Sequence, residues 1–401
     1  MKSMIDPDLR ATLPPAAETF PYFQPVLSLQ TQRIIGYEAL GRRVSPGIVR
    51  SLGPFFQNTS YSEAEHLRID RIIRSRAIGR MADADSDAKL FINLKPSWIH
   101  RIYREKRELP TLQMMRRHGL DPSRIVIEIT EEDFTGGLDE LSEMIGQYRE
   151  AGCLIAVDDI GSGYSNYDRI ASVKPHILKI DLKLLKKSAV DHGYNAVLNS
   201  FSILAAQMGA SLLVEGVETK GDLNHALQVG ARYVQGYLFS QAEADLQQED
   251  AYEGLLRESI AVFTHSELDR QHRLFAATER LSGLVPSSVE IRSSADADAL
   301  IGKLLPHVGA NVVRIYICKE EGFQVSSNFS READGSWSRD VRYQESNWIW
   351  RPYFIPTVLQ MKHQRQGCLS QPYTDLDSSL TMQTYSCPLG GACYLFFDLT
   401  I

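Results

Sequence analysis

Polar side chains that can bind metal ions end a series of short apolar runs in the first part of the chain. Glu38 ends the first of these runs, and Asp158 and Asp159 end the run at 154–157. The further members of the series are Asn93, Glu128, Lys179, Glu215 and Gln235. Carboxylate and amide oxygens are the ligands that hard divalent cations prefer. Together with a lysine, these residue types indicate a metal and phosphate site.

Side-chain alternation puts these polar groups on one face of the expected strands. Successive side chains of a strand point to opposite faces, so in the run 125–129 the isoleucines share one face and Glu128 lies on the other. Asp158 follows the same rule. If the apolar faces pack on helices, the polar faces point into a barrel, where ionised groups are costly unless they bind a cation or each other. Asp159 has the opposite parity and joins the site only if the chain turns sharply, as the glycines in 161–163 permit.

The elements that must position these groups alternate between strands and helices. Segments 138–151, 195–208 and 222–229 carry apolar residues at helical spacing. Repeated strand and helix predict an α/β fold, and eight such strands predict a (β/α)8 barrel with its active site at the carboxyl ends of the strands. The expected strands are 22–27, 34–40, 90–94, 124–130, 154–160, 177–180, 212–217 and 233–239.

The first two strands are joined by residues 28–33 alone, which are too few for a parallel crossover. We therefore expect an antiparallel first strand. A doubly wound nucleotide-binding sheet is the competing fold, but no glycine-rich phosphate loop follows any expected strand.

Length and composition agree with a barrel plus a smaller domain. The 401 residues exceed the roughly 250 of a typical barrel, and 43% of them are hydrophobic. The net charge of −7 argues against a nucleic-acid polymer as partner. No apolar stretch has membrane-spanning length and residues 1–20 lack an apolar core, so we expect no membrane span and a cytoplasmic location. The five cysteines form no CxxC pair and are interpreted as reduced thiols, Cys387 and Cys393 included.

Eight ordered segments resemble the EAL-domain phosphodiesterases of cyclic di-GMP, over about residues 18–245. They are YFQPV at 22–26, EALGR at 38–42, FINL at 91–94, IEITE at 127–131, DDIGSGYSN at 158–166, LKID at 178–181, VEGVET at 214–219 and QGYLFS at 235–240. The resemblance implies a barrel with a reversed first strand and two-metal hydrolysis of cyclic di-GMP to linear pGpG. The loop after Ser240 lacks the proline that is common there in the family.

The resemblance also implies ligands for two divalent cations, Mg²⁺ or Mn²⁺, in each site. Asp158 would bridge the two ions, and Glu215 would act through bound water. The implied metal ligands are Glu38, Asn93, Glu128, Asp158, Asp159 and Glu215.

Further roles follow from the same resemblance. Lys179 and Gln235 would contact the attacking water together with Glu215, and Glu131 would tether the loop 159–167, coupling dimer contacts to metal occupancy. The implied substrate-binding residues are Gln24, Glu38, Leu40, Arg42 and Asp181, with Gln24 and Arg42 reaching the phosphate.

After the barrel, residues 246–289 are expected to form a semi-rigid helical linker. Residues 290–401 change to short β-type runs at 312–318, 323–327, 384–387 and 394–399, after a helix at 295–305. This predicts a smaller α+β domain.

Motifs in this domain resemble Cache/PAS-type sensor domains: WRPYF at 350–354, QPYTD at 371–375 and TYSCP at 384–388. The resemblance implies that Arg351 and Asp375 contact a small ligand whose identity the sequence leaves open. An internal ion pair between the same two residues is the structural alternative.

Two classes of function remain. The first is a metal-dependent phosphodiesterase regulated by its C-terminal domain and acting as a homodimer. The second is a cyclic di-GMP receptor that keeps the site but hydrolyses little. The sequence favours the enzyme, because every metal position of the family is filled.

Overall fold

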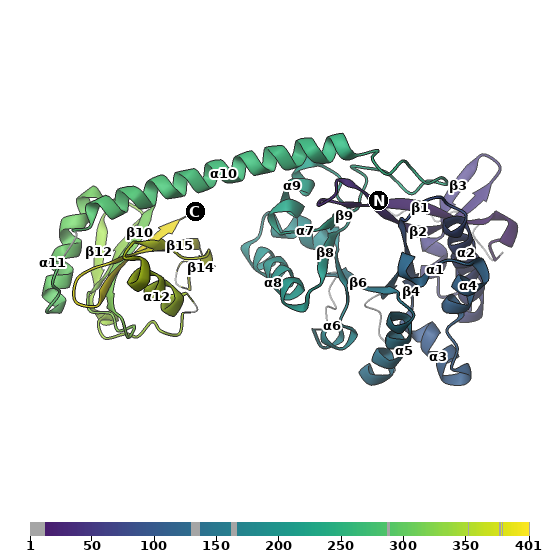
Figure 1. Cartoon of the computed structure of the whole chain (residues 1–401), viewed down its shortest axis with the longest axis horizontal. Coiled ribbons are helices and arrows are strands. Elements are labelled where there is room, and N and C mark those ends of the chain that lie inside the picture. Colours follow the sequence, from purple (N-terminus) through teal and green to yellow (C-terminus); the bar gives the residue numbers. More distant parts are fainter. Residues whose placement is uncertain are drawn as a thin grey trace. The chain divides into compact units, whose positions relative to one another are not determined.

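The structure is a computed structural model that describes residues 13–129, 137–161, 167–286, 289–351, 353–376, 378 and 380–400. The chain divides into two compact units, Met1–Thr264 and His265–Ile401. Figure 1 shows a ring of strands covered by helices in the first unit, and a smaller sheet with helices in the second. Within these described ranges, no helix is long and apolar enough to cross a membrane.

Within the described residues, eight strands close into a barrel. Their order around the ring is β1, β9, β8, β7, β6, β5, β4 and β2, and β1 pairs with β2 to close it. The strands are β1 (Thr19–Ser28), β2 (Arg33–Ser45), β4 (Lys89–Leu94), β5 (Ile125–Ile129), β6 (Leu154–Ile160), β7 (Ile177–Ile180), β8 (Ser211–Val214) and β9 (Tyr233–Val234). β1 is antiparallel to both neighbours, while the other ring pairs are parallel. The (β/α)8 barrel with an antiparallel first strand is therefore confirmed. The hairpin strand β3 (Ile48–Ser51), which pairs with β2 outside the ring, was not predicted.

Helices cover the outside of the ring (Figure 1). Local signals set their ends: Ser62 and Glu65 form a capping box at the start of α2, and Gly209 ends α8 in the left-handed conformation. The helices expected at 138–151, 195–208 and 222–229 are present as α5, α8 and α9. The helices of this unit are α1 (Gly53–Gln57), α2 (Glu63–Ala82), α3 (Pro96–Lys106), α4 (Pro110–His118), α5 (Leu138–Glu150), α6 (Tyr167–Val173), α7 (Leu182–Ser188), α8 (His192–Met208) and α9 (Lys220–Gln228).

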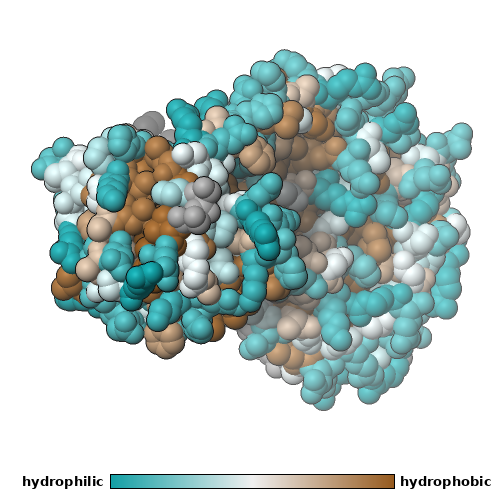
Figure 2. All heavy atoms as spheres, turned by 60° about the vertical axis from the view of Figure 1, so that its left-hand side comes forward, coloured by the Kyte–Doolittle hydropathy of each residue, from teal (hydrophilic) through white to brown (hydrophobic). Residues whose placement is uncertain are grey.

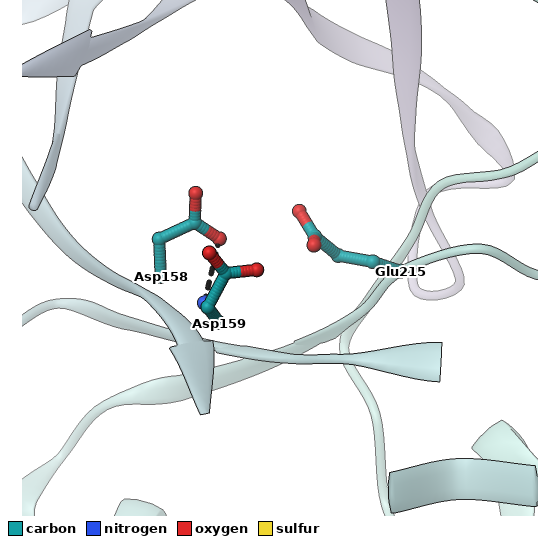
Figure 3. A group of neighbouring side chains, drawn as sticks. All are labelled: Asp158, Asp159 and Glu215. Atoms are coloured by element: carbon teal, nitrogen blue, oxygen red, sulfur yellow. Dashed lines mark hydrogen bonds between the residues drawn. The ribbon is translucent and has the colours of Figure 1, made fainter. Parts of the chain in front are cut away.

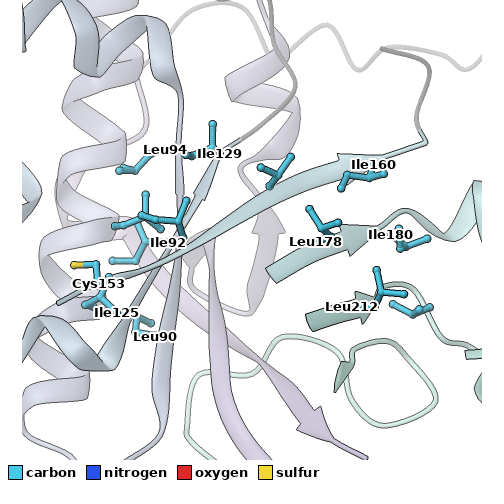
Figure 4. Close-up of a cluster of buried hydrophobic side chains, with 14 of the residues drawn as sticks. Leu90, Ile92, Leu94, Ile125, Ile129, Cys153, Ile160, Leu178, Ile180 and Leu212 are labelled. Atoms are coloured by element: carbon cyan, nitrogen blue, oxygen red, sulfur yellow. The ribbon is translucent and has the colours of Figure 1, made fainter. Parts of the chain in front are cut away.

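Side-chain alternation separates an outer core from an inner one. Outward-facing residues of the strands, several of which are labelled in Figure 4, form one large buried cluster with the covering helices. Gly36 on β2 leaves room for the ring of Phe91, since a Cβ at Gly36 would lie 2.8 Å from that ring. The inner core consists of Val26, Phe91, Val126, Ala156, Ile177 and Leu213.

The eighth strand is shorter than the sequence suggested. The prediction of a strand over 233–239 is wrong beyond Val234, because the backbone at Gly236 packs directly against Val217. A Cβ at Gly236 would lie 2.2 Å from the Val217 carbonyl oxygen, and Leu238 donates its N–H to that oxygen at 2.9 Å. The apolar residues after Gln235 therefore belong to a turn.

The segment expected to form a helical linker contains a single helix, α10 (Glu253–Leu284). Its surface carries ion pairs one turn apart, such as Arg257 with Glu253 and Arg270 with Glu267. The helix is continuous across the boundary between the two units at Thr264.

The C-terminal unit is the smaller α+β domain that was expected. Its sheet has the order β12, β11, β10, β16, β15, β13, with β14 paired to β15. The elements are α11 (Ser294–Leu304), β10 (Val312–Lys319), β11 (Asn328–Arg331), β12 (Trp337–Asp340), α12 (Phe354–Gln364), β13 (Cys368–Leu369), β14 (Tyr373–Thr374), β15 (Thr381–Pro388) and β16 (Cys393–Thr400). The PAS/Cache assignment of this domain stays a prediction.

All five cysteines of the chain are free and buried. Figure 2 shows a hydrophobic patch on the visible face of the C-terminal unit, within a largely hydrophilic surface.

The strand expected at 323–327 is absent, and the nearest strand is β11. Val325 donates its N–H to the Ile317 carbonyl at 2.8 Å, while the Ser326 hydroxyl accepts the N–H of Ile317 at 2.8 Å. Because a side chain supplies part of this pairing, the segment bends instead of extending the sheet.

Arg314 is the ion-pair partner of Asp375, so the alternative pairing with Arg351 is wrong. The guanidinium of Arg314 donates to Asp375 Oδ1 at 2.8 Å and to Asp375 Oδ2 at 3.1 Å. It also donates to Asp398 Oδ2 at 3.3 Å, because sheet register puts Arg314 opposite Asp398. Burial alone would raise the pKa of Asp375, but the hydrogen bonds and charge of Arg314 outweigh burial and lower it from 3.8 to about 2.

Replacing Asp375 by Asn should destabilise the C-terminal unit in a pH-dependent way. A carboxyl whose folded pKa is depressed contributes stability above its unfolded pKa of 3.8 and loses it as pH falls through about 2. We expect a loss of about 2 kcal/mol at neutral pH that shrinks steadily below about pH 4. Urea unfolding followed by the fluorescence of Trp337, Trp348 and Trp350 measures it, with the exposed Glu332→Gln as control. An equal loss of stability at neutral pH and well below pH 4 would contradict this account of the Asp375 ion pair.

Candidate functional site

The polar side chains inside the barrel form a layer next to the inner core, which we call the polar rim. On each of five parallel strands, a polar residue follows an inner-core residue by two positions, which is the repeat of a strand face. On the reversed strand β1, Gln24 precedes Val26 by two positions and lies opposite Glu38 of β2. The polar residues that follow the inner-core residues of the five parallel strands are Asn93, Glu128, Asp158, Lys179 and Glu215. Strand alternation in a closed ring therefore brings these side chains together.

Lys179 is fully buried at the centre of this group. Its Nζ lies 2.5 Å from Glu128 Oε1, 2.6 Å from Glu215 Oε1 and 3.1 Å from Asp158 Oδ1. Glu38 Oε2 is farther away, at 3.9 Å. Burial alone would lower the pKa of Lys179, but the charges of these four carboxylates outweigh burial and raise it well above the ordinary value. The lysine is therefore charged and compensates part of the carboxylate charge.

Glu38 is held by two amide side chains. Asn93 Nδ2 donates to Glu38 Oε1 at 2.8 Å, and Gln235 Nε2 donates to Glu38 Oε2 at 2.7 Å. Gln235 Nε2 also donates to Gln24 Oε1 at 3.1 Å, whereas Gln235 Oε1 is enclosed without a hydrogen-bond partner among the described residues. These bonds orient the Glu38 carboxylate before any ligand arrives.

Asp158, Asp159 and Glu215 form a candidate cation site, with one ligand atom from each lying within 4.8 Å of the others (Figure 3). The opposite parity of Asp159 is overcome by its left-handed backbone, with φ of +59°, and Asp158 Oδ1 accepts the N–H of Asp159 at 2.9 Å. Gly161 continues the turn at φ of +93°, where a Cβ would lie 2.5 Å from the side chain of Leu184. The left-handed backbone at Asp159 and Gly161 agrees with the sharp turn that was expected after Asp159.

The electrostatics of the rim fit a divalent cation. Four carboxylates against the single ammonium of Lys179 leave three negative charges when all are ionised. Burial raises the pKa of both Glu128 and Glu215 well above the usual range, against the opposing charge of Lys179. Glu128 Oε1 is paired with the ammonium of Lys179, whereas Glu128 Oε2 is enclosed without a hydrogen-bond partner among the described residues. A site with uncompensated oxygen donors and no thiolate suits Mg²⁺, Mn²⁺ or Ca²⁺.

A cavity of about 350 Å³ opens beside the carboxylates. Leu40, an expected substrate-binding residue, lies in its wall together with Tyr237 and Leu182, which were not predicted to belong to the site. Tyr237 is 64% exposed and stands two residues after Gln235 in the QGYLFS motif, which was the available signal. Arg42 lies near this cavity: its pKa is lowered by burial and raised by the nearby charges of Tyr237 and Glu38, with burial the larger effect. The full lining is Gln24, Glu38, Leu40, Leu182, Glu215, Gly216, Glu218, Gln235, Gly236 and Tyr237.

Asp181, an expected substrate-binding residue, is not among the residues that line this cavity. The carboxylate of Asp181 caps α7 by accepting the N–H of Lys183 at 2.7 Å. Glu131, the expected loop tether, lies outside the described residues, as does the middle of the loop 159–167 at 162–166.

The loop after β9 is held to β1 despite its missing proline. Phe23 and Glu243 exchange two backbone hydrogen bonds of 2.7 and 3.0 Å, and the Ser240 hydroxyl donates to Glu243 Oε1 at 2.8 Å. Gln24 Nε2 donates to the carbonyl of Ser240 at 3.1 Å. The loop is therefore coupled directly to a residue of the rim.

Two protein-family models match the chain. Residues 8–242 match the EAL domain, and residues 246–401 match the EAL-domain associated signalling protein domain. The chain is 37% identical over 387 residues to YkuI, an uncharacterized EAL-domain containing protein of Bacillus subtilis. This match covers 95% of this chain and 94% of YkuI. It is also 29% identical over 223 residues to the cyclic di-GMP phosphodiesterase RocR of Pseudomonas aeruginosa, and the match spans 56% of RocR.

Solved structures agree over the same regions. The crystal structure of YkuI in complex with its substrate c-di-GMP and calcium has a TM-score of 0.88 and 35% identity, covering 99% of this chain and 100% of that one. A standalone EAL protein from Vibrio cholerae, solved with c-di-GMP bound, has a TM-score of 0.52 and 26% identity, covering 59% of this chain and 97% of that one. The chain therefore belongs to the EAL domain family, with an EAL-associated signalling domain as its C-terminal part.

Proposed function

We propose that the protein hydrolyses one phosphodiester bond of cyclic di-GMP to give linear pGpG, using two Mg²⁺ or Mn²⁺ ions. The observation that carries this proposal is the convergence of buried, undercompensated carboxylates at one rim, beside a cavity. The complex of the related YkuI with c-di-GMP and calcium supports the same substrate and a divalent cation.

The proposed cation ligands come from β2, β4, β5 and β6, with Asp158 and Asp159 adjacent on β6, and from Glu215 directly after β8. Glu38, Asn93, Glu128 and Asp158 would hold one ion, and Asp158 and Asp159 the other, with Glu215 acting through water. Cations bound there would lower the pKa of a water molecule and neutralise negative charge on the phosphate.

The side chains of the protein supply orientation and charge. Lys179, charged and within 3.1 Å of three carboxylates, would attract the anionic phosphate and orient the attacking water. Gln235 would help to position the same water, because its Oε1 has no partner among the described residues. Gln24, Leu40, Arg42 and Asp181 are proposed to contact the substrate, and Glu131 to tether the loop 159–167.

A receptor that binds cyclic di-GMP with little turnover is the alternative. Incubation of the protein with cyclic di-GMP and Mg²⁺ or Mn²⁺, followed by chromatography, separates the two functions. Linear product selects the enzyme, whereas tight binding without product selects the receptor.

The protein should be a homodimer in which α10 and the region near the loop 159–167 contact a second copy. The support is the family resemblance together with exposed apolar residues on α10, such as Val262 and Leu268. Light scattering at micromolar concentration should give twice the chain mass of 45.1 kDa. A monomeric mass would contradict the prediction.

The C-terminal domain is proposed to be a PAS/Cache-like sensor that regulates the barrel. A ligand can change activity only if it binds two arrangements with different affinity, and α10 is the covalent connection between the units. Deleting residues 290–401 should therefore change metal affinity or the metal-dependent rate while leaving the product unchanged. If the truncated protein keeps the dimer state, metal affinity and turnover of the full chain, the domain is a docking module instead.

A further inference from the structure

A chain of hydrogen bonds connects the start of α10 to the polar rim. The hydroxyl of Tyr252, the residue directly before α10, donates to Gln247 Oε1 at 2.7 Å. Gln247 Nε2 donates to the Ser240 hydroxyl at 3.0 Å, and the carbonyl of the same serine accepts a hydrogen bond from Gln24 Nε2 at 3.1 Å. Because Gln24 faces the barrel interior, the chain of bonds leads from the linker into the candidate site.

Only one orientation of the two amides at the inner end of this chain satisfies all their partners. The Ser240 carbonyl takes a hydrogen bond from Gln24 Nε2, so Gln24 Oε1 faces Gln235 and accepts its N–H at 3.1 Å. Gln235 Nε2 also donates to Glu38 Oε2 at 2.7 Å. A backbone carbonyl and an ionised carboxylate can only accept, so turning either amide over would bring two acceptors together. The Ser240 carbonyl therefore helps to hold Gln235 in place beside Glu38.

Gln247 is fixed to the barrel through its backbone and through its neighbours. The Tyr37 hydroxyl donates to the Gln247 carbonyl at 2.9 Å and accepts the Gln247 N–H at 3.0 Å. The ring of Tyr252 meets that of Phe239 edge-on, with 5.6 Å between ring centroids, and Leu256 in the first turn of α10 is buried in the outer core. The side-chain amide of Gln247 is thus a bridge between two anchored hydroxyls and not a solvated surface group.

We infer that Gln247 is a positioning residue for the cation site. By holding the hydroxyl of Ser240 it fixes the carbonyl of that residue, and through Gln24 and Gln235 it fixes the carboxylate of Glu38. Outer partners that orient a metal ligand typically contribute 10–100-fold to metal affinity or activity. The inference rests on the proposed function, because it takes Glu38 to be a cation ligand. The bridge lies where the linker leaves the barrel, so it also gives α10 a direct connection to the site.

Calorimetric titration of the whole chain with Mn²⁺, in the absence of substrate, tests the inference. Gln247→Leu removes the side-chain bridge but keeps the backbone bonds to Tyr37, and it should weaken Mn²⁺ binding about tenfold. Tyr252→Phe removes a single hydroxyl and keeps the ring, so its loss should be smaller but in the same direction; it keeps the test decisive if Gln247→Leu does not fold. The electron paramagnetic resonance spectrum of bound Mn²⁺ should change in both variants, because the ligand oxygen of Glu38 is less uniformly placed.

Gln248→Leu is the matched control, since it makes the same change at the next residue, which is exposed. It should bind Mn²⁺ as the unmodified protein does. Gln24→Leu should weaken binding by itself, and adding Gln247→Leu to it should cost little more, because residues that act in one chain of contacts are not additive.

The inference is overturned if folded Gln247→Leu and Tyr252→Phe bind Mn²⁺ as the control does, or if the losses from Gln24→Leu and Gln247→Leu simply add. Failure of the unmodified protein to bind Mn²⁺ would overturn the proposed function and this inference together. Normal binding by the unmodified protein and by both bridge variants would overturn this inference alone, so the two failures remain distinguishable.

Discussion

Replacing Glu38 by Ala should abolish hydrolysis of cyclic di-GMP while the barrel stays folded. Glu38 is a rim residue whose two oxygens are oriented by Asn93 and Gln235, and it is proposed to hold a cation. Partners of metal ligands typically contribute 10–100-fold to affinity or activity, so loss of a ligand itself should cost more than about 100-fold. The fold should tolerate the change, because losing one carboxylate relieves repulsion with the acids around Lys179 and offsets the two freed amide donors.

The rate is measured as pGpG formed per enzyme, and the fold by circular dichroism and thermal unfolding. Glu38→Gln is a useful second variant, since it keeps the shape but removes the charge, and it should also be inactive. Glu258→Ala, which removes only an exposed ion pair with Lys220, is the matched control and should keep full activity. Near-normal turnover in folded Glu38→Ala would contradict the assignment of Glu38 as a metal ligand.

Replacing Lys179 by Met should destabilise the metal-free protein and stop turnover, without preventing metal binding. In the absence of metal, the ammonium of Lys179 is the cation nearest to Glu128, Asp158 and Glu215. Removing one partner of a buried ion pair typically costs about 3–5 kcal/mol. Added Mn²⁺ should restore most of the lost stability, because a divalent cation compensates the same carboxylates and binding stabilises the folded state.

Thermal unfolding with and without Mn²⁺, together with calorimetric titration of the ion, measures both effects. Lys186→Met is the control: this surface lysine pairs with Glu218 at 2.6 Å, and its loss should cost less than about 1 kcal/mol. If Lys179→Met no longer binds metal, Lys179 has a structural and not a catalytic role. An unchanged melting temperature of metal-free Lys179→Met would contradict the inference that the ammonium of Lys179 compensates the neighbouring carboxylates.

Much of the barrel and its rim followed from local rules. Side-chain alternation along the strand predicted that Ile127 and Glu128 point to opposite faces. In the structure Ile127 lies in the outer core and Glu128 in the polar rim, where it pairs with Lys179. The antiparallel first strand followed from the length of its connection, because no crossover fits between β1 and β2. Such features depend on a two-residue repeat and on chain length, and both are visible in a sequence.

Features that depend on contacts between distant segments could not be predicted. The early end of β9 is set by the backbone of Val217 against Gly236, and the partner of Asp375 is set by the sheet register that brings Arg314 opposite Asp398. The carboxylate of Asp181 caps α7, a role that was not predicted for it, while its proposed contact with the substrate stays a prediction. In each case a tertiary contact or a helix end decided between two locally reasonable outcomes.

Hydrolysis of cyclic di-GMP in ¹⁸O-labelled water tests the central claim most directly, because it follows the attacking oxygen itself. With Mg²⁺ or Mn²⁺ present, we expect pGpG carrying one ¹⁸O atom on its terminal phosphate, no product when the cations are chelated, and no product from Glu38→Ala. Cyclic di-GMP that binds to saturation and is recovered unchanged with the cations present would contradict the account and identify the protein as a receptor.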